Sequence, residues 1–217
     1  AGSFEQWRDD AGDFPAAAIG EPLDGWEDER WVDTRDATVR GILAARLDLA
    51  VERGCHGVEP DNVTAFQNKS GFDLTADDQL DFNRFLAGAA HRRGLLIGLK
   101  NDLAQIPALV DDFDFAVNEE CLQYDECDAY APFIDAGKAV FNAEYDESAV
   151  DDPAGTCAAA DAAAAETGAT TGTPADAAAC DLVILAVKPK DAPEALAALA
   201  AHAPSQSVVL SVVAGWD

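Results

Sequence analysis

The chain has 217 residues, of which 49% are hydrophobic, and this is enough to bury a sizeable core in one barrel-sized domain. Its formal net charge of −27, from 41 acidic and 14 basic residues, excludes nucleic acid as an expected partner, because the phosphates would be repelled. No apolar run reaches the ~20 residues that span a bilayer, and residues 1–5 lack the basic start and apolar core of a signal peptide.

Two interpretations of the negative charge are compatible with each other. An acidic, lysine-poor and alanine-rich surface is typical of proteins from high-salt or high-GC organisms, and this is the simpler explanation. A cleft lined with carboxylates would also attract a polycationic substrate.

The first half of the chain predicts an irregular start followed by two helices. Residues 1–36 show no clear period and are expected to be irregular, with a short strand or turn at 30–33. Trp26 in this part is a candidate for stacking on a sugar ring, although a tryptophan more often belongs to the core. From Asp36 a period of 3.6 residues predicts a helix that Gly54 closes. After a polar loop at 62–74, Thr75 is expected to cap a second helix.

The second half alternates between strand and helix patterns. We expect strands at 95–100, 114–119 and 139–144, with helices at about 103–112 and 128–136, and this alternation is typical of parallel βα units. Residues 161–179 are rich in Ala, Thr and Gly and predict a linker. Beyond it we expect strands at 182–187 and 207–213, with an amphipathic helix at 191–202 between them.

Ionisable and polar side chains follow four predicted strands at their C-terminal ends. They are Glu59, Asp61 and Asn62 at the end of a short strand that begins at Gly57, Lys100 and Asp102 after the strand at 95–100, Asn118 and Glu119 at the end of 114–119, and Glu144 and Tyr145 at the end of 139–144. Active sites of (β/α) barrels are built at this end of the strands. The sequence therefore predicts an α/β fold of the (β/α)-barrel type. The alternative for each charged residue is an ion pair between strand ends, which is as good an interpretation for Lys100 as a substrate role.

The cysteines leave two possibilities open. Cys121 and Cys127 are spaced to close a small disulfide loop if the chain is secreted, and are ordinary thiols if it is cytosolic. No Cys-x-x-Cys pair exists and no histidine stands near these two, so no zinc site is expected.

Several motifs, in order over about residues 1–160, resemble glycoside hydrolase family 114, the endo-α-1,4-polygalactosaminidases. They include Ala-Gly-Ser-Phe-Glu-Gln-Trp-Arg at 1–8, Gly-Val-Glu-Pro-Asp-Asn at 57–62, Gly-Leu-Lys-Asn-Asp at 98–102, Phe-Ala-Val-Asn-Glu at 115–119 and Val-Phe-Asn-Ala-Glu-Tyr at 140–145. The resemblance implies a secreted (β/α)8 barrel that cleaves cationic polymers containing α-1,4-linked galactosamine and uses no cofactor. Its catalytic carboxylates fall at Asp61 and Glu119.

Glycoside hydrolysis uses two carboxyl groups that flank the scissile bond, one protonated and one ionised. We assign Asp61 as nucleophile or base and Glu119 as acid. The side chains expected to bind sugar are Glu59, Asn62, Lys100, Asp102, Asn118, Glu144, Tyr145 and Trp26.

A second resemblance begins near residue 166. Residues 180–189 and 208–215 resemble the later part of the dinucleotide-binding domain of pyrroline-5-carboxylate reductase. The opening strand and the G-x-G-x-x-G turn of that domain are absent, so NADP binding is not expected.

Together the two resemblances predict an N-terminally truncated, partial barrel at 1–160, a linker at 161–179 and a Rossmann-like βαβ fragment at 180–217. A fusion of gene fragments, a frameshift or an assembly error explains this organisation most simply. A more adventurous hypothesis is that the strands at 182–187 and 207–213 fill vacant barrel positions. The functional alternatives to a hydrolase are a non-catalytic or decayed carbohydrate-binding barrel and, less favoured, a piece of an NADP-dependent reductase.

Overall fold

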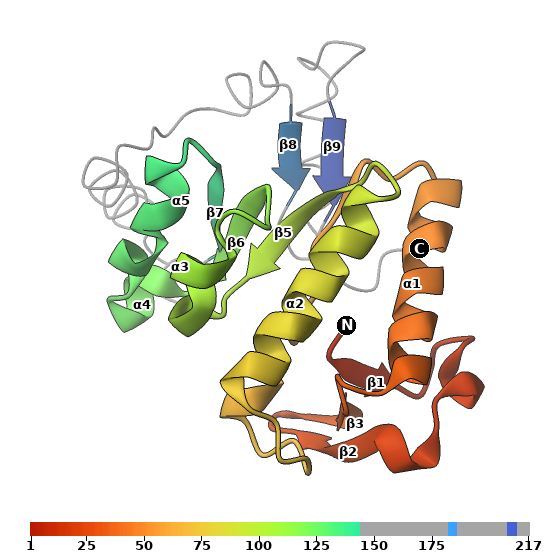
Figure 1. Cartoon of the computed structure of the whole chain (residues 1–217). Helices are drawn as coiled ribbons and strands as arrows, with labels where there is room; N and C mark the ends of the chain where they lie inside the picture. The colour runs from red at the N-terminus through yellow and green to blue at the C-terminus, as the bar shows by residue number, and fades with distance from the viewer. Residues whose placement is uncertain (144–181, 186–207, 212–217) are drawn as a thin grey trace, which may run out of the picture. The chain divides into compact units, whose positions relative to one another are not determined.

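The computed structural model describes residues 1–143, 182–185 and 208–211 (Figure 1). The chain divides into two compact units, Ala1–Val117 and Asn118–Asp217. The first unit holds a small antiparallel sheet, two long helices and the start of a parallel sheet. The second unit holds short helices and the strands that follow.

The N-terminal residues form a three-stranded antiparallel sheet in the order β1 (Ser3–Glu5), β3 (Trp26–Val32), β2 (Ile19–Leu23). Two short 3-10 turns, Ala11–Asp13 and Ala16–Ala18, lie between β1 and β2. The prediction that residues 1–36 are irregular is therefore wrong. Four of the seven residues of β3 are charged and its first three are exposed, so no alternation marks it, and only its last two residues are buried. Backbone pairing on both sides holds this strand in the sheet.

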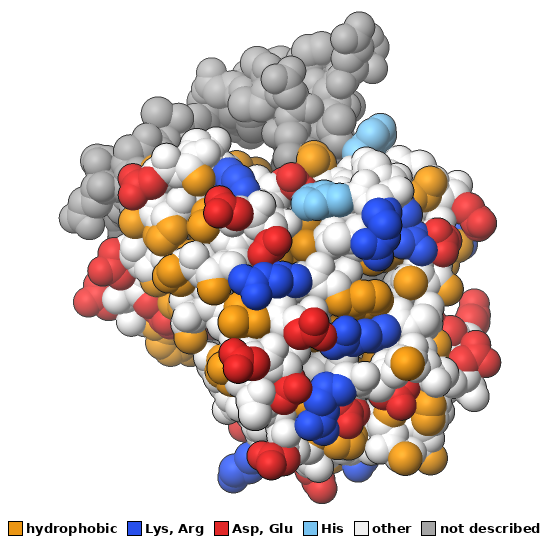
Figure 2. Space-filling view, viewed as in Figure 1, with side chains coloured by type: hydrophobic (Ala, Val, Ile, Leu, Met, Phe, Trp, Pro, Cys, Tyr) orange, Lys and Arg blue, Asp and Glu red, His pale blue; other side chains and the backbone are white. Residues whose placement is uncertain are grey.

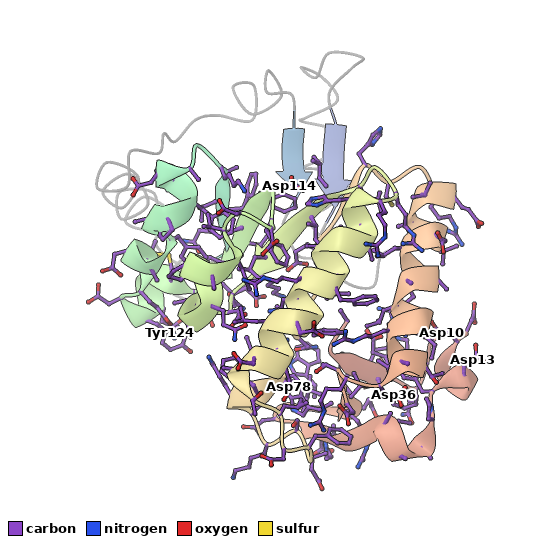
Figure 3. All side chains as sticks on the ribbon, in the orientation of Figure 1. Asp10, Asp13, Asp36, Asp78, Asp114 and Tyr124 are labelled. Atoms are coloured by element: carbon purple, nitrogen blue, oxygen red, sulfur yellow. A yellow bond between two sulfur atoms is a disulfide. The ribbon has the colours of Figure 1, made fainter. Side chains whose placement is uncertain are left out.

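The two predicted long helices are confirmed, and each begins at a side-chain cap. At α1 (Ala37–Glu52), Asp36 accepts hydrogen bonds from the N–H groups of Thr38 and Val39 at 2.8 and 3.0 Å. At α2 (Ala76–His91), Thr75 and Asp78 form a reciprocal capping box. Asp36 and Asp78 are labelled at these two helix starts in Figure 3.

The buried side of each helix faces the sheet or the other helix. The buried apolar residues are Val39, Leu43 and Leu47 on α1, and Phe82, Leu86, Ala87, Ala89 and Ala90 on α2. Helix α2 contacts both α1 and β5 (Leu96–Lys100), as Figure 1 shows. Burying each of the larger side chains contributes about 1.5–3 kcal/mol. Helix α2 also buries two amides, Gln79 and Asn83, which an apolar pattern does not predict.

The parallel strands of the first unit pair as the βα pattern predicts. Gly57 on β4 (Gly57–Val58) pairs with Leu96 on β5, and Lys100 pairs with Val117 on β6 (Phe115–Glu119). Strand β4 is short because Pro60 cannot donate to a ladder. The loop after it contains one 3-10 turn, Ala65–Gln67.

The helix predicted at about 103–112 is shorter than expected. It consists of a 3-10 turn, Leu103–Gln105, and a single α-helical turn, α3 (Ile106–Leu109).

The second unit continues from the end of β6. It contains α4 (Cys121–Tyr124), a 3-10 turn at Cys127–Tyr130, α5 (Ala131–Asp135) and β7 (Val140–Ala143). The Glu120 N–H donates to the Ala143 carbonyl at 2.7 Å, and the strand order of the sheet is β4-β5-β6-β7. The observed α/β fold with a parallel sheet agrees with the predicted class, and closure into an eight-stranded barrel stays a prediction.

The last two described strands, β8 (Leu182–Leu185) and β9 (Val208–Ser211), pair in parallel as a two-stranded sheet of their own. The hypothesis that they fill vacant positions in the barrel stays a prediction. The helix predicted at 191–202 lies outside the described residues. Among the helices that the structure describes, none is long and apolar enough to cross a membrane.

Candidate active site

An ion pair joins the C-terminal ends of two neighbouring parallel strands. Lys100, the last residue of β5, places Nζ 3.3 Å from Oδ2 of Asp61, which follows β4 by three residues. The Asp61 side chain is 55% exposed and that of Lys100 only 14%, so the carboxylate is open to solvent and the ammonium group is largely covered. The alternative predicted for Lys100, an ion pair between strand ends, is therefore present, and it orients Asp61.

Left-handed backbone conformations gather at the same strand ends. Within the first unit, Asn62 has φ 61° after β4, and Asn101 and Asp102 have φ 54° and 53° after β5. A non-glycine residue in this region costs roughly 1–2 kcal/mol, least for Asn and Asp. Such residues concentrate at functional sites, where the surrounding structure holds them in place. The left-handed residues therefore lie at the strand ends where the polar side chains predicted an active site.

The N-terminal sheet holds the loop that carries Asp61. The Gly2 N–H donates to the Asp61 carbonyl at 3.2 Å, and Nδ2 of Asn62 donates to the Ser3 hydroxyl at 3.1 Å. The Ser3 hydroxyl donates in turn to Glu29 on β3 at 3.0 Å, and the Asn62 N–H lies 2.6 Å from Oδ1 of Asp61. The supporting roles of Gly2, Ser3 and Glu29 are not predicted by the sequence. The one signal for the first two was that the family motif at 1–8 contains them.

The same sheet also packs on the rest of the loop after β4. Leu23, Trp31, Ala65 and Leu74 form a buried apolar cluster, against which Phe66 and Phe72 pack. The Glu21 N–H donates to the Ser70 carbonyl at 3.0 Å. The N-terminal sheet is therefore a support for the active-face loop.

Asp102 is buried behind the strand ends, with 2% of its surface exposed. Its Oδ2 accepts a hydrogen bond from Nδ2 of Asn83 at 2.9 Å. Burial raises the pKa of Asp102 to about 7, and the hydrogen bond from Asn83 opposes that rise. Such burial argues against direct contact between Asp102 and a sugar.

Asn118 is buried as well, and its Oδ1 accepts the N–H of Cys121 at 3.0 Å. This contact supports the start of α4 and argues against a direct sugar contact for Asn118. Glu119, the last residue of β6, is half-buried, as is Glu59 between β4 and Asp61. Glu144 and Tyr145 lie outside the described residues.

Trp26 is exposed, with 67% of its surface open to solvent, but it lies away from the Asp61 loop. It pairs with Leu23 at the β2–β3 turn, whereas Trp31 pairs with Ser3, which contacts Asn62. Trp31 is five positions after Trp26, which corresponds to roughly 17 Å along a strand. The structure therefore does not bring Trp26 to the ion pair.

Cys121 and Cys127 are joined by a disulfide, with the sulfur atoms 1.95 Å apart. The bridge spans from α4 to the following 3-10 turn. Within the described ranges Cys55 is a free, exposed thiol.

Comparison with known proteins gives two matches to families. The sequence model of glycoside-hydrolase family GH114 matches residues 1–177. The model described as NADP oxidoreductase coenzyme F420-dependent matches residues 146–215, so the C-terminal part is reductase-like, as predicted. No curated protein matches the chain.

Several solved structures resemble the chain. One is Ega3 from Aspergillus fumigatus, in complex with galactosamine, at 35% sequence identity and a TM-score of 0.65, covering 98% of this chain and 70% of Ega3. Another is the glycoside hydrolase domain of PelA from Pseudomonas aeruginosa, at 17% identity and a TM-score of 0.45, covering 99% of this chain and 77% of that domain. The family match and the identity to Ega3 both cover most of the sequence. The chain belongs to glycoside-hydrolase family GH114.

Proposed function

We propose that this chain hydrolyses polysaccharide that contains α-1,4-linked galactosamine, with Asp61 and Glu119 as its carboxylate pair. The observation that carries the proposal is the 35% identity to Ega3 over 98% of the chain, because the Ega3 crystal structure holds galactosamine. The proposal includes secretion, an environment in which the Cys121–Cys127 disulfide would persist. It also includes the (β/α)8 barrel at 1–160, the linker at 161–179 and the Rossmann-like fragment at 180–217.

Asp61 is suited to the role of nucleophile or base. Its carboxylate is exposed, and the Lys100 ammonium and the Asn62 N–H approach its two oxygens. These two contacts fix the orientation of the carboxylate. A fixed carboxylate is already aimed at the anomeric carbon or at a water molecule, and this orientation lowers the activation barrier of hydrolysis.

Glu119 is proposed as the acid, and strand alternation supports this assignment. Val117 pairs with Lys100, so these two side chains point to the same face of the sheet. Glu119 follows Val117 by two positions along β6 and projects to that same side of its strand. An acid at this place would donate a proton to the leaving oxygen.

The ligands of the sugar are proposed from the polar groups beside Asp61. Glu59 and Asn62 flank it in the chain, and a carboxylate such as Glu59 would pair with the ammonium group of galactosamine. Glu144, Tyr145 and Trp26 stay proposed contacts for a longer stretch of substrate.

The test is the release of reducing ends from partially deacetylated α-1,4-galactosaminan by the wild type, Asp61→Asn and Glu119→Gln. We expect each variant to lose about 10³-fold or more in kcat, because each removes an essential proton or electron-pair transfer. Asp112→Asn, which removes a carboxylate bound to Arg84 away from the strand ends, is the matched control and should keep activity.

Circular dichroism would verify that all variants are folded. Full activity in Asp61→Asn would overturn the assignment of that residue. A folded wild type that binds the polymer but never cleaves it, with Asp61→Asn binding equally well, would instead establish the non-catalytic carbohydrate-binding alternative.

A further inference from the structure

Polar side chains from two elements meet beside the loop that carries Asp61. Helix α2 contributes Gln79 and Asn83, which are both fully buried. The segment after β5 contributes Asp102 and Gln105, exposed by only 2% and 5%. We call these four residues the polar seam. Burying a polar group is unfavourable unless the group makes hydrogen bonds. The hydrogen bonds of the seam therefore decide whether its burial is tolerated.

Asn83 is the centre of the seam. Its Nδ2 donates to Oδ2 of Asp102 at 2.9 Å and to the carbonyl of Val63 at 3.2 Å, and its Oδ1 accepts from Nε2 of Gln79 at 2.9 Å. One amide therefore ties α2 to the segment after β5 and to the loop after β4. Val63 stands two residues after Asp61, so this tether acts on the loop that carries the proposed catalytic carboxylate.

The seam holds more buried acceptor oxygens than N–H groups that donate to them. Oδ1 of Asp102 and Oε1 of Gln79 are buried and have no hydrogen-bond partner within the described part of the chain. Oε1 of Gln105 is in the same state, while its Nε2 donates to the Ala76 carbonyl at 2.8 Å. A proton on Oδ1 would change one of these acceptors into a donor and would remove a buried charge.

We propose that Asp102 acts as a neutral carboxylic acid that, through Asn83, holds the Asp61 loop in its working position. Asp102 is then a positioning residue, and its effect on hydrolysis rests on the proposed function. The elevated pKa, about 7, which burial causes and the Asn83 hydrogen bond opposes, agrees with this assignment.

The charged groups around the seam are few in the described residues. Lys100 is the last residue of β5 and stands two positions before Asp102. Lys100 forms its ion pair with Asp61, on the loop after β4. The face of α2 toward the seam provides the uncharged Ala76, Gln79 and Asn83, while Arg84 is exposed and binds Asp112.

Ionisation of Asp102 would leave a buried carboxylate with Asn83 as its hydrogen-bond donor. A buried charge with so few donors is strongly unfavourable, and the seam would open to admit water. Opening at Asn83 would release Val63 and loosen the Asp61 loop.

The experiment compares the wild type with Asp102→Asn, which has the size of the neutral acid and cannot ionise. The ratio of the kcat of Asp102→Asn to that of the wild type is measured between pH 5 and 9, which cancels the titration of groups common to both. We expect a ratio within about twofold of one at pH 5–6, rising by up to tenfold per pH unit above about pH 7. Asp112→Asn should give a ratio that does not change with pH. A flat ratio for Asp102→Asn would overturn the proposal.

A second measurement does not depend on hydrolysis. Amide hydrogen exchange of peptides covering residues 61–67 is compared between the wild type and Asp102→Asn at the same pH, so that intrinsic exchange rates cancel. We expect equal exchange at pH 6 and faster exchange in the wild type at pH 9. A wild type without hydrolase activity would refute the proposed function alone, and equal exchange at both pH values would refute the seam.

The wild type alone provides a third measurement if Asp102→Asn does not fold. The pKa of Asp102 in the folded state lies above the unfolded value of 3.8, so between about pH 4 and 7 the folded state keeps a proton that the unfolded state has lost. The contribution of Asp102 to stability is therefore complete at low pH and is lost as the pH rises toward 7. The carboxyl groups with lowered pKa values, Glu5, Asp10, Asp33, Asp48 and Asp78, raise stability only as the pH rises to about 5. The urea midpoint of the protein should therefore fall between about pH 5.5 and 7, and a rising midpoint in that range would contradict the proposal.

Discussion

At the scale of single residues, the site depends on a glycine that carries no chemistry. A Cβ added at Gly2 would overlap the carbonyl oxygen of Asn62, and the Gly2 N–H and carbonyl are both engaged, with Asp61 and Val32 respectively. We expect Gly2→Ala to push the Asp61 loop away from β1, to destabilise the fold by about 1–3 kcal/mol and to lower kcat by at least about tenfold.

The measurements for this variant are urea unfolding and reducing-end release. Gly12→Ala is the matched control, because nothing lies within 4 Å of a Cβ at that position. Equal behaviour of the two variants would show that the contact between residue 2 and the loop is not needed.

The site residues that could be predicted from the sequence are charged residues at positions where such side chains are expected to be functional. Asp61 and Lys100 stand where parallel strands end, and charged groups at such ends are expected to meet. Asn83 could not be predicted, because an amide inside a helical pattern is assigned to the exposed side, and only the fold shows that Val63 and Asp102 are within reach. The left-handed Asn62 and Asp102 likewise depend on contacts far away in sequence.

At the scale of elements, α2 is the support of the active face, since it carries Asn83 and packs on β5. Its first turn depends on Thr75, whose Oγ1 accepts the Asp78 N–H at 3.1 Å while the Thr75 N–H donates to Oδ2 of Asp78 at 2.8 Å. We expect Thr75→Ala to lower the free energy of unfolding by about 1 kcal/mol. Urea unfolding measures the change.

Thr38→Ala on α1 is the control for this prediction. Thr38 is exposed and lies inside the helix, where alanine is the better helix former, so stability should change by only a few tenths of a kcal/mol. An equal loss of stability in both variants would contradict a specific role for the capping box.

The success of sequence prediction for the elements follows the strength of local signals. Asp36 and Thr75 are capping residues that mark the starts of α1 and α2 in the sequence. Gly54, which has φ 79°, marks the end of α1. Strand β3 was missed because Glu27, Asp28 and Glu29 have low strand propensity, and it is the pairing with β1 and β2 that makes them a strand.

At the scale of the whole molecule, the charge of −27 is large but locally mixed where basic residues occur. Figure 2 shows basic side chains beside acidic ones, and three ion pairs of α1 and α2 are Arg40–Asp81, Arg84–Asp112 and Arg93–Asp48. Exposed pairs of this kind contribute about 0–1 kcal/mol each. The acidic excess is therefore better judged by its long-range field than by its contacts.

That field separates the two interpretations of the charge. If the acidic surface attracts a cationic polymer, salt should screen the attraction, since the Debye length falls from about 10 Å at 0.1 M to 3 Å at 1 M. We expect the KM for deacetylated, positively charged galactosaminan to rise several-fold between about 0.05 and about 0.5 M NaCl, a range that brackets physiological ionic strength.

The fully N-acetylated polymer is the matched control, because it carries no charge and its KM should change little with salt. An equal salt dependence for both polymers would show that the field does not guide the substrate. The acidic surface would then be explained by solubility in its own environment, and the specificity for galactosamine would have to come from the polar groups beside Asp61 alone.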